Sequence, residues 1–338
     1  GSGQVPGSGQ LPGSGQVPGS GQVPPGGFLR EAGLVILPGQ VCPREGRAWL
    51  VEWRGTRGIL RQLPGPAAAG SARAADVAWL HEFLTRLATL GFPSPRPLPC
   101  FAGRSWVICG GTLWEIVSYL SGHAVGWDAE PTMEEIGALL ARYHAAARRV
   151  PATGQRPGAL PLADVPGVLL SGQLEAAHVD PDRAAVIRRH AEQLARDLDG
   201  TGHHTGERLV IHGDFTNDNV IADGRPAAAT GVIDFALAHA ETPLADIGYG
   251  LWRSGRPQPE ADHLDLPRVA RFLRGYASVI PLTADQARVI PVYMRGRGLQ
   301  MIAKRVRAGR DKRGMLPEVQ WLSAHAEAIA DALASTVS

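Results

Sequence analysis

Three oxygen-bearing side chains near the middle of the chain have the types and the spacing that phosphoryl transfer requires. Asp214 precedes Asn219 by five residues, and Asp234 follows a second apolar run after a short turn. In this chemistry one carboxylate orients the attacking hydroxyl and accepts its proton, while an amide oxygen and a second carboxylate hold Mg²⁺ against the nucleotide phosphates. We therefore predict that Asp214 is the catalytic base and that Asn219 and Asp234 are metal ligands. The alternative is an ordinary turn between strands, because Asp and Asn are common turn residues.

Short apolar runs must place these three side chains. One run, 209–211, leads into the first carboxylate. A second, 220–221, stops at Asp223-Gly224, a dipeptide typical of hairpin turns, and a third, 232–233, leads into Asp234. We expect two short strands joined by a turn, which bring both carboxylates and the amide to the same end of one small sheet. The catalytic loop of protein kinases has the same order of Asp, Asn and metal-binding Asp.

The segment from His212 through Asn219, together with Ile233-Asp234-Phe235, resembles the signature of the aminoglycoside phosphotransferase and choline kinase superfamily. These are small-molecule kinases with a protein-kinase-like fold. The resemblance implies that Arg61, on the third strand of the amino lobe, grips the nucleotide phosphates where many relatives carry Lys. It also implies that His212 and Asp246 give structural support to the catalytic loop.

The kinase pattern further requires an acidic residue that braces Arg61 and a loop that covers the phosphates. Asp76 and Glu82, on a helix predicted over 71–90, are both candidates for the brace, and spacing does not choose between them. The segment 38–46 stands where the phosphate loop belongs but has no G-x-G-x-x-G, so the contacts to the phosphates stay unassigned. His144 lies in a Leu-Ala-x-x-His segment that relatives share, and we expect it to be a packed structural histidine.

The order of the periodic patterns predicts an α+β, bilobal protein-kinase-like fold, with a small antiparallel-sheet amino lobe and a mainly helical carboxy lobe. Four GSGQVP-type repeats lead us to expect a disordered tail over 1–27. The nucleotide-binding amino lobe is expected over 28–119 and the helical catalytic and acceptor-binding lobe over 120–338. A hairpin is expected around Arg54–Arg57. Helices are expected at 71–90, 133–150, 182–198, 264–277, 284–306 and 317–334.

Composition narrows the classes of partner. No apolar run approaches the ~18 residues of a membrane span, so no membrane contact is expected. The formal net charge of +2 argues neither for nor against a polyanionic partner. Acidic residues interrupt the basic face of the helix predicted at 182–198, and no aromatics interleave, so no nucleic acid is expected. The three cysteines show no metal spacing, and their odd count fits a reducing cytoplasm. Nothing in the sequence indicates an oligomeric state.

We therefore expect a small-molecule kinase that transfers the γ-phosphoryl group of ATP or GTP, with Mg²⁺, to a hydroxyl acceptor. The acceptor expected is an antibiotic or another secondary metabolite, as for a resistance or self-protection phosphotransferase. From Ala236 onward the chain has 10 acidic and 14 basic residues, a balance that weakens the option of a polycationic aminoglycoside. The alternatives are a metabolic kinase of the homoserine or choline type and a nucleotide-binding pseudokinase scaffold, which only the missing Gly-rich loop supports.

Overall fold

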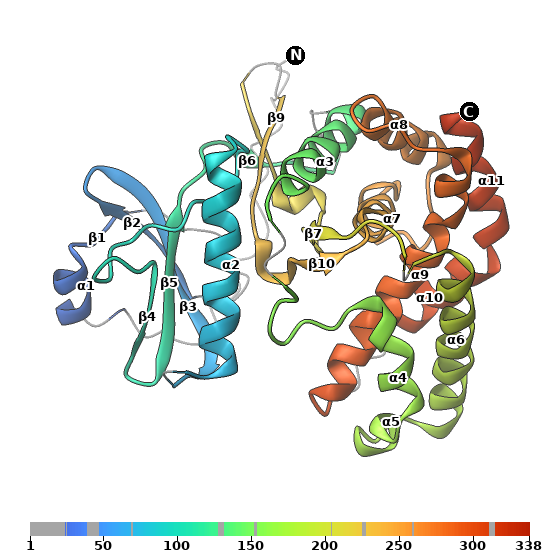
Figure 1. Ribbon diagram of the computed structural model, residues 1–338, viewed down its shortest axis with the longest axis horizontal. Coiled ribbons are helices and arrows are strands. Elements are labelled where there is room, and N and C mark those ends of the chain that lie inside the picture. The colour runs from blue at the N-terminus through green and yellow to red at the C-terminus, as the bar shows by residue number, and fades with distance from the viewer. Residues whose placement is uncertain are drawn as a thin grey trace, which may run out of the picture.

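The computed structural model describes residue 24 and nine stretches of the chain that follow it, with short gaps between them. The described stretches are 26–38, 47–68, 70–127, 132–151, 154–203, 205–224, 228–258, 260–310 and 315–338, with 24 standing alone before them. The repeats of the predicted tail and most of the predicted phosphate loop, 39–46, lie outside the described residues. Figure 1 shows a sheet-based lobe beside a larger helical lobe, which confirms the predicted α+β, bilobal architecture.

The amino lobe is built on one antiparallel sheet. Its strands lie in the order β1-β2-β3-β5-β4. They span β1 Val35–Ile36, β2 Ala48–Trp53, β3 Thr56–Pro66, β4 Trp106–Cys109 and β5 Thr112–Ser118. The predicted hairpin is confirmed: β2 and β3 turn at Arg54-Gly55, and both residues have positive φ (49° and 76°), as a tight two-residue turn requires. A short helix, α1 (Gly26–Ala32), precedes the sheet, and its Phe28 ring stacks on Phe101 at 5.2 Å.

Helix α2 (Ala72–Thr89) joins the two lobes. Ser71 caps its start by accepting a hydrogen bond from the amide of Ala74, which confirms the predicted helix almost to the residue. The inward side chains Phe83 and Leu87 are fully buried and belong to the same apolar core as the carboxy lobe, whereas Leu60 of β3 lies in the separate core of the amino-lobe sheet. The position of α2 is therefore fixed by the helical lobe as well as by the sheet.

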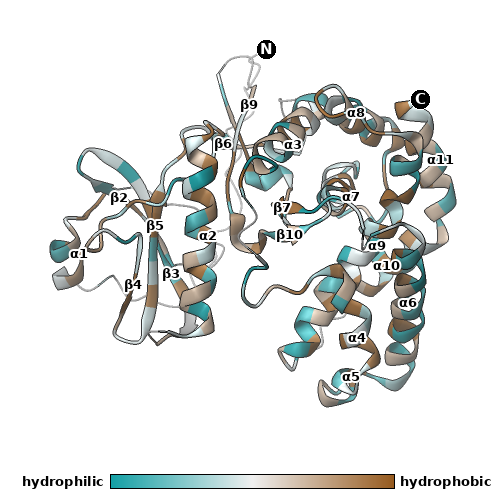
Figure 2. Ribbon diagram, in the orientation of Figure 1, coloured by the Kyte–Doolittle hydropathy of each residue, from teal (hydrophilic) through white to brown (hydrophobic). Residues whose placement is uncertain are grey.

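The carboxy lobe is mainly helical. Its helices are α3 (Met133–Ala147), α4 (Val165–Leu170), α5 (Gln173–Ala176), α6 (Pro181–Gly200), α7 (Pro243–Ser254), α8 (Leu266–Ala277), α9 (Ala284–Arg307), α10 (Leu316–Ala324) and α11 (Ala326–Val337). The single helix predicted over 317–334 is wrong, because the chain breaks at His325 into α10 and α11. In Figure 2 apolar residues line β5 of the amino lobe, while hydrophilic residues lie along the outer side of α6. None of the helices described is long and apolar enough to cross a membrane.

The catalytic stretch lies between two small sheets. Strand β7 (Leu209–Ile211) pairs with β10 (His239–Glu241), and β8 (Val220–Asp223) pairs with both β9 (Ala228–Val232) and β6 (His123–Ala124). The predicted β8–β9 hairpin is confirmed, but the expectation of one sheet for all three side chains is wrong. The run before the first carboxylate finds its partner in β10, which follows Asp234 along the chain, because the fully buried backbone of β7 needs a neighbouring strand.

Candidate active site

The catalytic loop begins where β7 ends, and one buried carboxylate holds its start. Gly213 has φ +74°, and a Cβ placed there would lie 2.3 Å from the carbonyl oxygen of Leu237, so only glycine fits this turn. Asp246, at the start of α7 and fully buried, accepts hydrogen bonds from the backbone amides of His212 (2.7 Å) and Gly213 (2.8 Å). The third partner of Asp246 is the Nε2 of His144 at 3.2 Å. The loop thus starts from a fixed point inside the helical lobe.

Hydrogen bonds determine the ionisation of this buried support. Burial alone would raise the pKa of Asp246, but the hydrogen bond from His144 and the amide of Gly213 lower it, so the group stays a carboxylate. His144 is itself fully buried and contacts the hydroxyl of Tyr276 through Nδ1 at 2.8 Å. The expectation that His144 is a packed structural histidine is confirmed.

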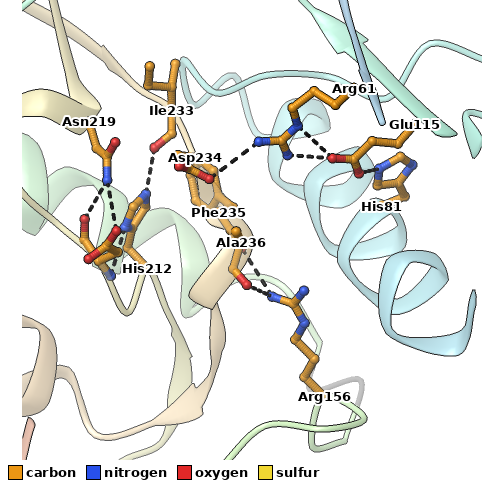
Figure 3. A network of polar contacts seen from close by, with 11 residues as sticks. Arg61, His81, Glu115, Arg156, His212, Asn219, Ile233, Asp234, Phe235 and Ala236 are labelled. Atoms are coloured by element: carbon orange, nitrogen blue, oxygen red, sulfur yellow. Dashed lines mark hydrogen bonds and ion pairs between the residues drawn. The ribbon is translucent and has the colours of Figure 1, made fainter. Parts of the chain in front are cut away.

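His212 connects the catalytic loop with the segment that carries the second carboxylate. Its Nδ1 accepts a hydrogen bond from the amide of Asp214 (3.2 Å), and its Nε2 lies 2.9 Å from the carbonyl oxygen of Ile233. Figure 3 shows the imidazole between the two segments. Since Ile233 directly precedes Asp234, the ring fixes the spacing between the two carboxylate-bearing segments.

Asn219 connects the two carboxylate-bearing segments. Its Nδ2 donates to the backbone oxygen of Asp214 at 2.8 Å and lies 3.4 Å from the Oδ2 of the same residue. Its backbone oxygen accepts from the amide of Ile233 at 2.9 Å. No described residue donates a hydrogen bond to the Oδ1 of Asn219. The amide oxygen is therefore available to a cation.

Asp234 occupies an unusual backbone conformation at the end of β9. It has φ 62° and ψ 65°, the left-handed region that Asp tolerates better than most residues. Its side chain is 45% exposed, and among the described residues it forms an ion pair with Arg61, whose Nη1 lies 3.5 Å from Oδ1. A half-exposed carboxylate and a free amide oxygen, on segments joined by the backbone hydrogen bond from Ile233 to Asn219, are ligands that suit Mg²⁺. This cation takes oxygen ligands and usually needs only one or two carboxylates in addition to phosphates and water.

Arg61 is braced by Glu115 and not by either acidic residue of α2. Arg61 on β3 and Glu115 on β5 are directly opposite in the sheet, and both Nε (2.7 Å) and Nη2 (2.6 Å) contact Oε1 of the carboxylate. The expected brace is wrong for both candidates, since Asp76 pairs with Arg156 and Glu82 pairs with Arg86. Side chains opposite each other on antiparallel strands share a face, so the strand register, which the sequence did not reveal, would have identified the partner.

Glu115 is the centre of a buried polar cluster. Its second oxygen lies 2.9 Å from the Nε2 of His81 on α2, and the Nδ1 of that ring lies 2.6 Å from the hydroxyl of Ser105. Burial alone would raise the pKa of Glu115, but the charge of Arg61 and the hydrogen bond from His81 lower it to about 2. The carboxylate is thus ionised at neutral pH, and it holds Arg61 in position toward Asp234, as Figure 3 shows.

Arg156 is a functional residue that sequence reasoning missed. Its Nη1 donates to the carbonyl oxygens of Phe235 (3.2 Å), Ala236 (2.8 Å) and Ala238 (3.0 Å), directly after Asp234. Its Nε and Nη2 bind both oxygens of Asp76 on α2, at 2.6 and 2.8 Å. One buried guanidinium therefore ties the loop after Asp234 to the amino-lobe helix (Figure 3). It lies in a Pro/Gly-rich segment without periodicity, and only its charge could have marked it.

Two further residues of the carboxy lobe lie beside Asp214. The Nη2 of Arg297, on α9, lies 4.0 Å from the Oδ1 of Asp214, and its guanidinium stacks over the ring of Tyr249 at 4.6 Å. Burial, together with the charge of Asp214, raises the pKa of Tyr249 to about 12, so this phenol stays protonated. A cleft of about 590 Å³ opens nearby, between α2, the loop at 156–160, the segment 236–239 and the end of α9.

Known proteins share both the sequence pattern and the fold. The model of the phosphotransferase enzyme family matches residues 44–282. A homoserine kinase of Methylobacterium radiotolerans is 28% identical over 238 residues, which cover 69% of this chain and 70% of that protein. A homoserine kinase of Polaromonas naphthalenivorans is 29% identical over 224 residues, which cover 64% of this chain and 66% of that protein.

Solved structures agree in fold at lower identity. The microcompartment-associated aminopropanol kinase superposes with a TM-score of 0.61 at 19% identity, covering 88% of this chain and 91% of that chain. An amicoumacin kinase in complex with AMP-PNP, Ca²⁺ and Ami gives a TM-score of 0.59 at 15% identity, with 88% of each chain covered. Because the family model spans more than half of the sequence, the chain belongs to the phosphotransferase enzyme family and is a small-molecule kinase.

Proposed function

We propose that this kinase transfers the γ-phosphoryl group of ATP or GTP to a hydroxyl group of an antibiotic or another secondary metabolite. Asp214 positions the acceptor hydroxyl and accepts its proton. Asn219 and Asp234 hold Mg²⁺, which neutralises charge on the phosphates, and Arg61 binds the phosphates. His212 and Asp246 keep the catalytic loop in place. The observation that carries this proposal is the convergence of Asn219 on Asp214 within 3.4 Å and of Arg61 on Asp234 within 3.5 Å.

Positioning and charge are sufficient for this chemistry, because phosphoryl transfer needs little covalent help from the protein. The hydrogen bond to the backbone of Asp214 fixes that carboxylate relative to the metal-binding amide. Arg61, held by Glu115, approaches from the opposite lobe. Complete machinery of this kind disfavours the pseudokinase scaffold. The free thiols of Cys100 and Cys109 fit a protein of the reducing cytoplasm.

A homoserine kinase is the second candidate, and a specific observation favours it. Curated relatives with 28% and 29% identity bear that name, whereas the antibiotic kinases of similar fold are under 25% identical and share only the architecture. Incubating the full chain with Mg²⁺-ATP or Mg²⁺-GTP and either L-homoserine or a set of hydroxylated antibiotics, and following the gain of one phosphate by mass, separates the two candidates. Turnover of L-homoserine alone would reject the antibiotic acceptor.

Paired substitutions test the roles of the carboxylates. Asp214→Asn should lower kcat by about 10³-fold or more while the Kd of Mg²⁺-nucleotide changes little. Asp234→Asn should weaken Mg²⁺-nucleotide binding as well. Asp223→Asn is the matched control, because this exposed carboxylate at the end of β8 contacts only the amide of Gly224 among described residues. Near-native turnover by Asp214→Asn on the true acceptor would show that the assignment is wrong.

A further inference from the structure

The cleft beside the catalytic residues has an excess of positive charge. Seven ionisable side chains of fixed sign line it, and five of these are basic: Arg61, Arg73, Arg156, Lys304 and Arg307. The two acidic residues are Asp76 and Glu115. Both are already neutralised, because Asp76 binds Arg156 and Glu115 binds Arg61. The acidic residues therefore balance two of the basic ones, and three cations remain without a counter-charge.

The three remaining cations lie on two elements that face each other across the cleft. Arg73 is in the first turn of α2, while Lys304 and Arg307 are one turn apart at the end of α9. Among the residues that the structure describes, none of the three takes part in an ion pair, and the Nε of Arg73 is buried without a hydrogen-bond partner. An uncompensated group of cations is costly unless an anion joins it.

The surroundings of Lys304 disfavour its positive charge. Burial, with the nearby charges of Arg297 and Arg156, lowers its pKa to about 7, and only the more weakly acting charge of Asp214 opposes the change. An ammonium held close to its point of deprotonation is stabilised when an anion binds beside it. Lys304 lies two turns along α9 from Arg297 and on the same face of the helix, and the Nη2 of Arg297 lies 4.0 Å from the Oδ1 of Asp214. Lys304 is therefore on the side of the cleft where the acceptor hydroxyl has to arrive.

We propose that Lys304, assisted by Arg73 and Arg307, binds an anionic group of the acceptor, so that the acceptor is an alcohol that also carries a carboxylate, phosphate or sulfate. This inference rests on the proposed kinase function. It narrows the acceptor class, because a polycation would be repelled by the same side chains. The nucleotide phosphates are the other anions present, but they are assigned to Arg61 and Mg²⁺ on the Asp234 side.

Sulfate is a suitable probe of this anion site. The full chain is saturated with Mg²⁺ and AMP-PNP, which fills the nucleotide side, and sulfate is then titrated by calorimetry. We expect Lys304→Met to weaken sulfate binding by about tenfold, the loss typical of one charge-assisted contact. Arg305→Met is the matched control, since this neighbouring cation of α9 does not line the cleft, and it should leave the affinity within about twofold. Arg307→Met, with an exposed side chain, provides a second variant whose folding is not at risk.

Four results would overturn the proposal. The first is equal sulfate affinity in wild type and Lys304→Met, and the second is a loss of sulfate affinity in Arg305→Met as large as that in Lys304→Met. The third applies if Lys304→Met fails to fold, and it is unchanged sulfate affinity in Arg307→Met. The fourth is that Lys304→Met loses affinity for AMP-PNP and not for sulfate. Failure to bind Mg²⁺-AMP-PNP at all would instead contradict the kinase function. L-homoserine and its neutral amide extend the test to turnover: kcat/KM should favour the carboxylate, and a preference for the amide would also overturn the proposal. If neither is phosphorylated, the sulfate comparison decides.

Discussion

Glu115→Gln tests the brace that positions Arg61, and its cost follows from the ionisation of the buried carboxylate. The pKa of Glu115 falls from the usual 4.5 to about 2. A difference of one pKa unit corresponds to about 1.4 kcal/mol, so ionised Glu115 contributes about 3 kcal/mol to folding at neutral pH. This agrees with the ~3–5 kcal/mol typical of removing one partner of a buried ion pair. The amide keeps the volume of the side chain and removes only the charge.

The contribution of Glu115 to the free energy of unfolding should depend on pH in one direction only. The native pKa is depressed, so the contribution is fully present above pH 4.5 and is lost as the pH falls toward 2. Urea unfolding of wild type and Glu115→Gln should therefore differ by about 3 kcal/mol at pH 7, and the difference should shrink by about 1 kcal/mol at pH 4. Because Arg61 loses its fixed orientation, the KM for Mg²⁺-nucleotide should rise by about tenfold, whereas kcat changes less.

Glu82→Gln is the matched control for this experiment. Glu82 is on α2 and pairs with Arg86, but the side chains are 52% and 39% exposed. An exposed pair of this kind contributes ~0–1 kcal/mol, so the variant should behave like wild type in unfolding and in KM. Equal stability of Glu115→Gln and wild type at pH 7, or a raised KM in Glu82→Gln alone, would refute the assignment of the brace.

Three further perturbations follow from the described contacts. Arg156→Met should lower the free energy of unfolding in urea by about 3 kcal/mol and raise the Mg²⁺-nucleotide Kd severalfold, because it removes the buried contacts between α2 and the loop after Asp234. Arg148→Met, which breaks an exposed ion pair, should stay within ~1 kcal/mol of wild type. Equal effects of the two substitutions would show that Arg156 does not hold this loop. Because the native pKa of Lys304 is lowered to about 7, stability should rise by up to about 2 kcal/mol from pH 7 to pH 9, and Lys304→Met should abolish that rise. In Gly275→Ala the new Cβ would lie 1.9 Å from a backbone oxygen of α3, so the free energy of unfolding in urea should fall by more than ~3 kcal/mol, or no soluble protein should form. Gly167→Ala is the control, because its new Cβ would have nothing within 4 Å, and it should be neutral or slightly stabilising.

Local patterns predicted the parts of the molecule that depend on short-range physics. Helix α2 was bounded correctly because a capping Ser71 and Gly91 frame a run of apolar residues at helical spacing. The β2–β3 and β8–β9 hairpins followed from turn residues between apolar runs. The catalytic segment could be read because its three functional residues lie within 21 positions of one another along the chain.

Contacts between distant segments could not be predicted in this way. The brace of Arg61 depends on which residue of β5 faces it, 54 positions away, and neither strand carries a signal of register. Strand β10 is short and contains His and Glu, so nothing marked it as the partner of β7. The break at His325 has no Gly or Pro beside it, and packing of α11 against α8 and α9 sets it instead. Arg156 acts across the lobes from a segment without periodicity.

The guanidinium at position 61 has a consequence for chemical labelling. The chain contains only two lysines, Lys304 and Lys312, and neither occupies position 61, where the side chain contacts Asp234. Acylating nucleotide analogues that rely on a lysine at this position should therefore not modify the side chain there. The amine of Lys304, with a pKa of about 7, is largely uncharged in mildly basic buffer and therefore nucleophilic. Amine-directed reagents should accordingly mark the α9 side of the cleft, and the modified residue should be Lys304 and not the side chain at position 61.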